Sequence, residues 1–563
     1  MIFALLLVLL SVSAIYLLKI DNQFVFDDKV FIENCPRHSS PANIPNFFVT
    51  DHFRLYRPIR SIVYTVTRAL FGIDPVAHNI AGILFHDAMV AVFFFLCLRL
   101  LHSLRAATLA ALFFGLHPLA AANVTFMTAS FDVPGLAIGF SSLLPYLTWL
   151  RTGKRESLSI SLLLLLLGLL ASEQCAVVPL LMILLLFYRN LGFPLVKRRI
   201  AYAVSASFAI LIAYLILRSI VVVGFSRVNS YSAGGIYPTL LTMSVVFWKY
   251  VRLSFFPTGL AADHSVTIIE HLSPAPIIGA LGIIALVVLF FVSRKKAPVL
   301  FLALGWFFIN LSPVSNIIPI QTFFAERYGY SSLMGIAMLC GFAVDRLLAI
   351  QTTSLRRGLV YGALGLIFGC MLIQTVDRIR VWHDPFSLWT DNLIKYPNNT
   401  TANHNMGVAL NENGRSQEAI PYFLKVIEVD PKHSESYRML GKTYEKLGDL
   451  EKAKKYYWLA VEKFEQRLKE TPGHPRTLER LTELYALLGD RHSALKYADQ
   501  LLSDDPDNAI ALNAASFIFA SIGRCDLAIP MFEHLIAVDE TGEFADGAKA
   551  NLKRCREQPL LKN

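Results

Sequence analysis

Long apolar runs separated by short polar connections fill the first 376 residues of this chain and constrain its fold more than any other feature. A transmembrane helix needs about 20 mostly apolar residues, so each run is a candidate span. Eleven runs qualify: 2–19, 77–101, 106–120, 131–150, 157–173, 175–188, 200–224, 275–293, 297–313, 331–350 and 358–376. Hydrophobic residues make up 55% of the chain and charged residues 17%, which favours a membrane protein over a soluble one.

Basic residues in the connections predict the orientation of these spans. They gather in alternate connections, as is typical of loops that stay on the cytoplasmic side. They are Arg105, Arg151, Lys154, Arg155, Arg189, Lys197, Arg198, Arg199, Arg294, Lys295, Lys296, Arg356 and Arg357. This alternation requires that the amphipathic run 238–256 does not cross the membrane. The sequence therefore predicts eleven spans, a cytoplasmic N-terminus whose first run stays as an anchor, and an extracytoplasmic C-terminal part.

A repeat begins near residue 400, where the sequence becomes polar with helical periodicity. Small and aromatic residues recur at roughly the 34-residue period of tetratricopeptide (TPR) repeats. The recurring residues are Gly407, Ala419, Phe423, Gly441, Ala453, Tyr457, Tyr485, Gly489, Ala494, Phe519, Gly523, Ala528 and Phe532. We expect about four repeats with a capping helix at 541–556, and a concave groove that binds a protein or peptide. A spacer or a dimerisation module is the alternative.

The expected fold is therefore all-α, with a polytopic membrane domain at 1–378 and an α-solenoid of TPR repeats at 379–563. The seven cysteines form no CxxC or Cys/His pattern, so the sequence predicts neither a zinc site nor a disulfide framework. Cys525 and Cys555 lie on two late helices, and whether they pair stays open at this point.

The first outer loop, about 21–76, carries the residues most suited to chemistry. Asp27 and Asp28 follow the first span, and Arg54, Arg57 and Arg60 lie at a spacing that puts them on one side of a helix. A carboxylate can take a proton from an acceptor hydroxyl. Guanidinium groups can hold a phosphate and stabilise it as it leaves. The alternative is an ion-paired loop that rests on lipid headgroups.

Further polar residues lie at the same predicted side of the membrane. We expect them to line one outer cavity at headgroup level, where a lipid-linked phosphate would lie, because charged groups within spans are costly and usually functional. These residues are Arg218, Glu326, Arg327, His86, Asp87 and Glu173. Polar groups packed between helices are the alternative for each of them.

Several segments resemble one known superfamily. They are FVFDD, YRPIRSIVY, HNIAGILFHD, HPLAAANVTF, NLSPVSNII, AERYGYSSLMG and VWHDPFSLW. In their order and placement they are similar to the GT-C glycosyltransferases, which use polyprenyl-phosphate sugars. The branch that fits is the transmembrane and TPR-containing protein O-mannosyltransferases with their bacterial relatives.

The resemblance implies an inverting transfer of mannose or another hexose from a polyprenyl-phosphate donor to a hydroxyl of a protein. It implies Asp27 as the general base, with Asp28 as a neighbour that orients it or shares the proton. It implies Arg57 and Arg327 as ligands of the donor phosphate, and Arg218 as a weaker third. The resemblance implies no nucleotide sugar and does not settle metal dependence. The sequence offers no convincing metal cluster, and we expect no cofactor besides the donor and no nucleic-acid partner.

The sequence departs from the eukaryotic members in two ways. It reads Ser130-Phe131-Asp132 where those members tend to have Arg-x-Asp, which leaves the choice of mannose and of the acceptor open. Its repeats are also fewer, so we expect a bacterial inner membrane with a periplasmic TPR domain rather than the endoplasmic reticulum. Two alternatives stay open: a non-catalytic scaffold whose repeats recruit envelope-assembly partners, and the same transfer to a lipid or glycan acceptor.

Overall fold

The computed structural model describes residues 1–33, 35–50, 55–188, 191, 196–222, 231–320, 322–351, 353–538 and 544–557. Within these ranges the chain is all-α, as predicted, and forms no β-strand. It divides into two compact units, Met1–Lys395 and Tyr396–Asn563, which are described separately below.

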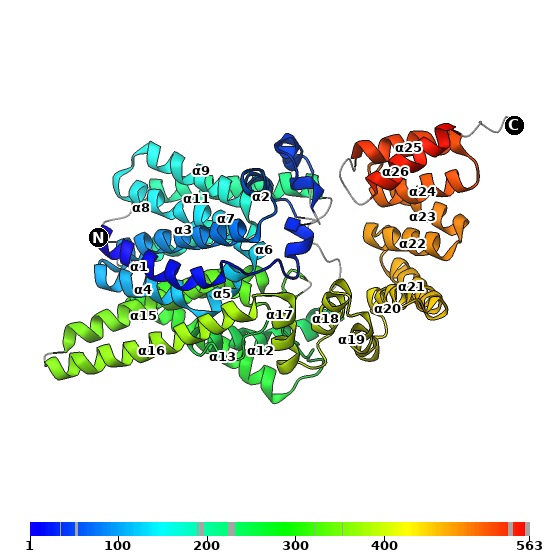
Figure 1. Ribbon diagram of the computed structural model, residues 1–563. Helices are drawn as coiled ribbons and strands as arrows, with labels where there is room; N and C mark the ends of the chain where they lie inside the picture. The colour runs from blue at the N-terminus through cyan, green and yellow to red at the C-terminus, as the bar shows by residue number, and fades with distance from the viewer. Residues whose placement is uncertain are drawn as a thin grey trace. The chain divides into compact units, whose positions relative to one another are not determined.

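The first unit is a helical bundle (Figure 1). Its α-helices are α1 Ile2–Tyr16, α2 Pro58–Phe71, α3 Pro75–Leu101, α4 Leu104–Leu116, α5 Pro118–Thr125, α6 Met127–Ser130, α7 Val133–Ser141, α8 Leu143–Thr152, α9 Arg155–Ala171, α10 Val178–Phe187, α11 Lys197–Val222, α12 Ile236–Phe255, α13 Pro274–Lys296, α14 Pro298–Leu311, α15 Tyr330–Ile350, α16 Ser354–Val381 and α17 Pro385–Lys395. Short helical turns complete it: η1 Leu17–Lys19, η2 Lys29–Glu33, η3 Pro36–His38, η4 Pro41–Phe48, η5 Glu173–Val177, η6 Ser312–Val314 and η7 Glu326–Gly329.

All eleven predicted runs are helical, but eleven spans are not confirmed. Among the described residues, seven helices are long and apolar enough to cross a membrane, or eight if the bent pair α4–α5 counts as one span. The runs at 175–188 and 297–313 form α10 and α14, which are shorter than the ~20 residues that usually span a bilayer, and the run at 157–173 forms the 17-residue α9, at the lower limit.

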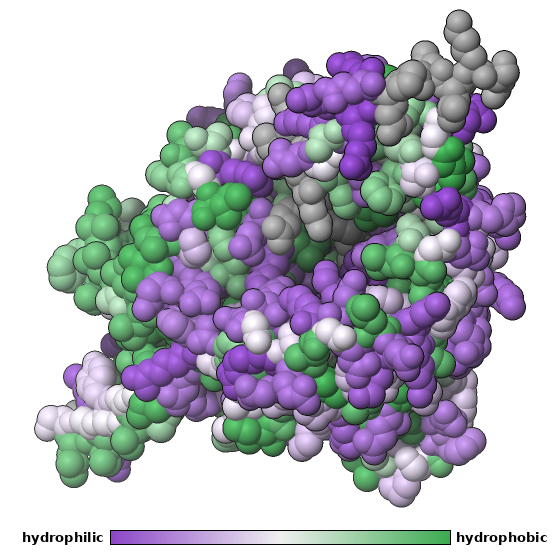
Figure 2. Space-filling model, turned by 45° about the vertical axis from the view of Figure 1, so that its right-hand side comes forward, coloured by the Kyte–Doolittle hydropathy of each residue, from purple (hydrophilic) through white to green (hydrophobic). Residues whose placement is uncertain are grey.

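Exposed apolar surface shows that this unit is an integral membrane unit. Only 11% of the most apolar windows of α13 and α16 is buried inside the protein. Ile278, Phe291, Leu359 and Leu366 are each more than 65% exposed. The left-hand part of the surface in Figure 2 is accordingly predominantly hydrophobic. Apolar surface on this scale is stable in contact with lipid rather than water.

The bend between α4 and α5 shapes the end of the bundle that carries the first outer loop. Pro118 has no backbone N–H to continue α4, and the ring of His117 caps α5 by accepting a hydrogen bond from Leu119 N at 3.1 Å. The two helices meet at 59°. After this bend come α5 and α6, and α2, α6 and α17 lie toward the right-hand end of the bundle in Figure 1.

The second unit consists of paired helices, as the TPR pattern predicts. The helices are α18 Thr400–Glu412, α19 Ser416–Val429, α20 Ser434–Lys446, α21 Leu450–Glu470, α22 Pro475–Leu488, α23 Arg491–Asp504, α24 Ala509–Ser521, α25 Cys525–Val538 and α26 Ala545–Glu557. A Cβ on Gly441 would lie 2.4 Å from the ring of Tyr457, so the glycine permits the close helix crossing that the repeat requires. Cys525 and Cys555 form a disulfide that joins α25 to α26.

The boundary between the units lies later than the predicted residue 378. Helix α17 belongs to the first unit. Lys395 donates to the backbone carbonyl of Leu260 at 2.6 Å, and Asp391 accepts from Arg378 at 3.1 Å. Trp389 of α17 is 1% exposed in the first unit. These contacts attach α17 to the bundle.

Candidate active site

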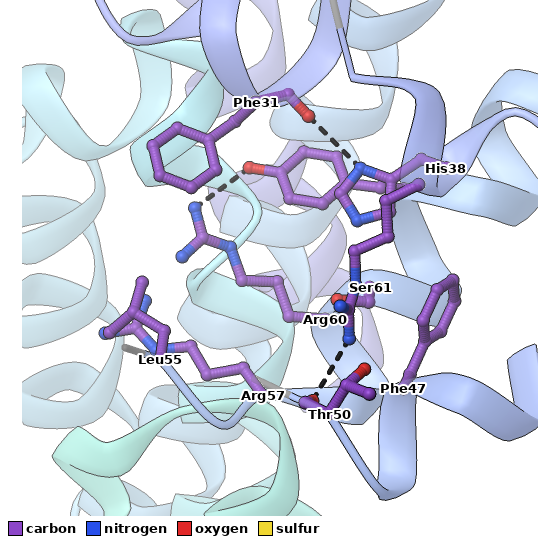
Figure 3. Close-up of a pocket in the computed structure, with 10 residues that line it drawn as sticks. Phe31, His38, Phe47, Thr50, Leu55, Arg57, Arg60 and Ser61 are labelled. Carbon is purple, nitrogen blue, oxygen red and sulfur yellow. Dashed lines mark hydrogen bonds between the residues drawn. The ribbon is translucent and has the colours of Figure 1, made fainter. Parts of the chain in front are cut away.

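The start of α2 brings two of the predicted arginines to the first outer loop. Arg57 is the N-cap of α2, and Pro58 fits the first helical position, where no backbone N–H is needed. Arg60 follows three residues later and points to the same side. Both side chains line the pocket in Figure 3, together with Phe31, His38 and Phe47 of the loop.

An ion cluster connects α2 to three other parts of the bundle. Arg57 donates to Asp132 at 2.7 Å and to Glu173 at 2.9 Å. The guanidinium group of Arg60 lies 3.0 Å from the same Asp132 oxygen. Arg218, near the end of α11, lies 3.5 Å from Glu173. The cluster therefore brings together five residues from four parts of the sequence, and four of them are predicted site residues: Arg57, Arg60, Glu173 and Arg218.

Asp28 is joined to this cluster through one residue, Thr128. The Asp28 carboxylate accepts hydrogen bonds from Thr128 N and Thr128 Oγ1, both at 2.6 Å, and from Val25 N at 3.2 Å. Arg60 donates to the carbonyl oxygen of the same Thr128 at 2.9 Å. Asp28 is fully buried. Burial raises the pKa of Asp28 to about 7, against the opposing effect of these hydrogen bonds.

Asp27 occupies a different environment from its neighbour. It is half-buried, and its carbonyl oxygen accepts hydrogen bonds from Val30 N and Phe31 N at the start of η2. The preceding Phe26 has a φ of 53°, a left-handed conformation that is costly for an aromatic residue. The rings of Phe126 and Trp389 lie 5.9 and 5.3 Å from the Phe26 ring and hold it there. The backbone therefore turns at Phe26, immediately before Asp27 and Asp28.

A stack of aromatic rings packs against the Arg60 side chain. Tyr64 lies between His38 and Phe131, with ring centroids 5.0 and 4.3 Å apart, and its hydroxyl accepts from Arg60 at 2.9 Å. The Arg60 guanidinium carbon lies 5.3 Å above the Tyr64 ring. Stacking and hydrogen bonding together restrict the rotamers of Arg60.

The arrangement can bind an anion. The guanidinium groups are those of Arg57, Arg60 and Arg218, and the carboxylates are those of Asp132 and Glu173. These five groups together carry one net positive charge. The Nε atoms of Arg57 and Arg60 are buried and have no hydrogen-bond partner among the residues that the structure describes. Buried donors of this kind are costly unless a ligand completes them, and phosphate oxygens match guanidinium geometry.

Glu326 lies in a second buried cluster, not with the arginines of α2. It accepts hydrogen bonds from Ala261 N at 2.5 Å and from His264 Nε2 at 2.8 Å, and Arg378 lies 3.7 Å away. Burial lowers the pKa of His264, although the charge of Glu326 opposes this. Because Arg378 also binds Asp391 of α17, this cluster ties η7 to the last helix of the first unit.

Two of the remaining predicted residues, His86 and Asp87, lie apart from both clusters. His86 is fully buried in α3 and bonds Tyr330 Oη at 2.7 Å and the Gly115 carbonyl at 3.1 Å. Asp87 accepts from Ser13 of α1 at 2.5 Å. These are contacts of polar groups packed between helices, so the expected single cavity is divided. Arg327 is half-buried and forms no ion pair with the described residues. Arg54 lies outside the residues that the structure describes.

Thr128 and Tyr64 connect the site but were not predicted from the sequence, because a threonine and a tyrosine in a helical sequence are common packing residues. Lys19 ends the first apolar run, is fully buried and donates to the Val124 carbonyl at 2.5 Å. A lysine inside an apolar run could have been noticed, because it must find a partner there.

The second unit has its own buried charge network, on α20 and α22. Arg438 donates to Glu435 at 2.7 Å and lies 3.4 Å from Glu483, while Arg480 lies 2.9 Å from Glu483. Within the described part of this unit, the Nε atoms of both arginines are buried without a hydrogen-bond partner. A helix surface that carries such arginines can donate hydrogen bonds to backbone carbonyl or carboxylate oxygens of a polypeptide.

Comparison with known proteins gives the following. The family model described as tetratricopeptide repeat matches residues 399–466. Protein O-mannosyl-transferase TMTC3 of Mus musculus is 24% identical over 94% of this chain, and TMTC3 of Homo sapiens is 24% identical over 93%. Protein O-mannosyl-transferase F38B6.6 of Caenorhabditis elegans is 23% identical over 76% of this chain. The chain spans 62% of the length of both mammalian relatives and 63% of the nematode one.

Proposed function

We propose that this chain, an O-mannosyltransferase-like membrane protein with TPR repeats, is an inverting glycosyltransferase. It transfers a hexose from a polyprenyl-phosphate donor to a hydroxyl group of a protein on the extracytoplasmic side. The observation that carries the proposal is the arginine cluster of Arg57, Arg60 and Arg218, joined to Asp28 through Thr128. The similarity to protein O-mannosyl-transferases along nearly the whole chain supports it.

In this proposal the arginines hold the donor phosphate. The guanidinium groups of Arg57 and Arg60, whose Nε atoms have no partner among the described residues, would donate hydrogen bonds to its oxygens. The excess positive charge would stabilise the phosphate as its bond to the sugar breaks. Arg327, which has no carboxylate partner within the described residues, is the further cation for this role. Such a cluster most favours the step in which negative charge develops on the leaving phosphate.

Asp27 is the general base in this proposal, and Asp28 is a positioning residue. Three hydrogen bonds hold the carboxylate of Asp28, which leaves it little freedom to meet an acceptor. Asp27 is half-buried and lies beside it on the strained turn at Phe26. A base must reach the acceptor hydroxyl, so the more accessible carboxylate fits this role.

The second unit binds the acceptor or a partner protein on the extracytoplasmic side in this proposal. The disulfide between Cys525 and Cys555 supports that location, since disulfides persist in oxidising compartments and are rare in the cytoplasm. The alternate distribution of basic connections supports the same orientation for the bundle. A bacterial inner membrane stays the predicted location.

The test is hexose transfer to extracytoplasmic proteins, followed by intact-mass analysis. Asp27→Asn should lower transfer by a factor of about 100 or more, since a general base contributes 10²–10⁴. The matched control is Asp21→Asn, because Asp21 lies in the same loop and is exposed, with its carboxylate 3.7 Å from His383 Nε2. Equal hexose additions in wild type and Asp27→Asn would refute the base assignment. Absence of any hexose in wild type would refute protein glycosylation.

A further inference from the structure

An apolar groove lies on the bundle between α10 and α13, with α14 as its floor. It encloses about 320 Å³, within the lower range of small-molecule sites. Leu180, Ile183 and Phe187 of α10 form one wall, and Phe290 and Phe291 of α13 form the other. We call it the α10–α13 groove.

The groove exists because α14 has a glycine, Gly305, at the point where both walls pack against this helix. A Cβ on Gly305 would lie 2.4 Å from Leu184 Cδ1 and 2.9 Å from Phe290 Cε2. Phe290 is in turn stacked on Phe301 of α14, with ring centroids 4.5 Å apart. Both walls are therefore fixed on α14, while the space between them stays open.

Arg294 is the charged member of the lining and closes one end of the groove. Its guanidinium carbon lies 4.7 Å from the centre of the Phe187 ring, which connects α13 to α10. Arg294 begins the basic sequence Arg294-Lys295-Lys296 in the last turn of α13. Within the described ranges no carboxylate pairs with Arg294, so its positive charge is available to a ligand.

This end of the groove is remote from the candidate active site. Glu173 of the ion cluster and Phe187 lie at opposite ends of the continuous segment η5–α10. Fourteen residues of helix correspond to roughly 20 Å. A phosphate held at Arg294 is therefore a different phosphate from one held at Arg57.

We infer that the α10–α13 groove binds an anionic glycerophospholipid of the leaflet on the basic side of the bundle. One acyl chain fills the apolar walls, and the headgroup phosphate pairs with Arg294. An apolar groove at membrane depth is filled by hydrocarbon rather than water. Basic residues between helices at the membrane surface favour anionic headgroups, which selects this lipid class over neutral ones.

Native mass spectrometry of the full chain in a mild detergent tests the inference. The probes are phosphatidylglycerol and phosphatidylcholine with identical acyl chains. We expect wild type to retain one phosphatidylglycerol, and Arg294→Gln to lower that retention about tenfold, the equivalent of one charge-assisted hydrogen bond. Arg294→Lys should restore much of it. Arg198→Gln removes an exposed arginine from the same basic side and should leave retention unchanged.

Four outcomes would overturn the inference. They are equal retention of the two lipids, unchanged retention in Arg294→Gln, an equal loss in Arg198→Gln, and a retained mass that corresponds to a polyprenyl phosphate. A variant that misfolds is recognised by its elution profile in size-exclusion chromatography. In that case Ile183→Trp, which fills the groove without touching the charge, should lower retention in the same assay.

Discussion

Two adjacent carboxylates, Asp27 and Asp28, have different surroundings, and this difference determines what each can do. Asp28 is fully buried, and burial raises its pKa to about 7. The folded protein therefore holds the Asp28 proton more tightly than the unfolded chain does. The resulting stabilisation is fully present below about pH 4, the usual aspartate pKa, and is lost as the pH rises through 7.

The first prediction follows from this proton. In wild type, the unfolding temperature measured by intrinsic fluorescence should fall as the pH rises from 5 to 8. In Asp28→Asn this fall should be smaller, since asparagine has no proton to lose and its carbonyl can still accept from Thr128. Asp21→Asn, in the same loop and exposed, should retain the wild-type pH dependence. An identical slope in all three proteins would contradict the buried titration of Asp28.

At the scale of helices, the distance between two carboxylates depends on how closely α7 and α9 cross. Arg57 bridges Asp132, just before α7, and Glu173, just after α9. A Cβ on Gly168 of α9 would lie 2.5 Å from Gly139 Cα of α7. Backbone cannot move aside as a flexible side chain can, so any larger residue at 168 must separate the helices.

Gly168→Ala should therefore weaken both stability and the ion cluster. We expect a loss of about 1–3 kcal/mol, typical of overpacking, together with reduced hexose transfer. Thermal unfolding and the transfer assay measure the two effects on the same preparation. Gly362→Ala is the control, because nothing lies within 4 Å of a Cβ at this position of α16. It should be neutral or slightly stabilising, since alanine favours helix. Normal transfer by Gly168→Ala would show that the crossing does not position the cluster.

The sequence predicted the helices well because apolar runs and TPR spacing are local signals. It did not predict the span count, since α10 and α14 are apolar yet short and α9 is at the lower limit for a span. The placement of the candidate residues was predicted in part. Arg57, Arg60, Arg218 and Glu173 lie together, but the link from Asp28 to Thr128 joins residues 100 positions apart. That contact depends on the bend at Pro118, whose angle no local pattern specifies.

At the scale of the whole molecule, the division after Lys395 changes which truncation preserves the membrane unit. A boundary at 378 assigns α17 to the repeats, whereas the structure attaches it to the bundle. Asp391 and Lys395 of α17 bond Arg378 and the carbonyl of Leu260. Arg378 is only 5% exposed and also lies beside the buried Glu326. Removal of α17 would leave Arg378 buried with one of its two carboxylates missing.

Two truncated chains test this division. A chain ending at Lys395 should elute as a single species and unfold close to the temperature of the full-length bundle, while losing transfer to protein acceptors. A chain ending at Arg380 should be less stable by about 3 kcal/mol or more, the usual cost of breaking a buried ion pair, and should aggregate on purification. Asp391→Asn in the full chain isolates the charge from the loss of the helix, and it should be destabilised by less than the shorter truncation. Equal stability of the two truncated chains would show that α17 adds nothing to the bundle, and the boundary would then belong before it.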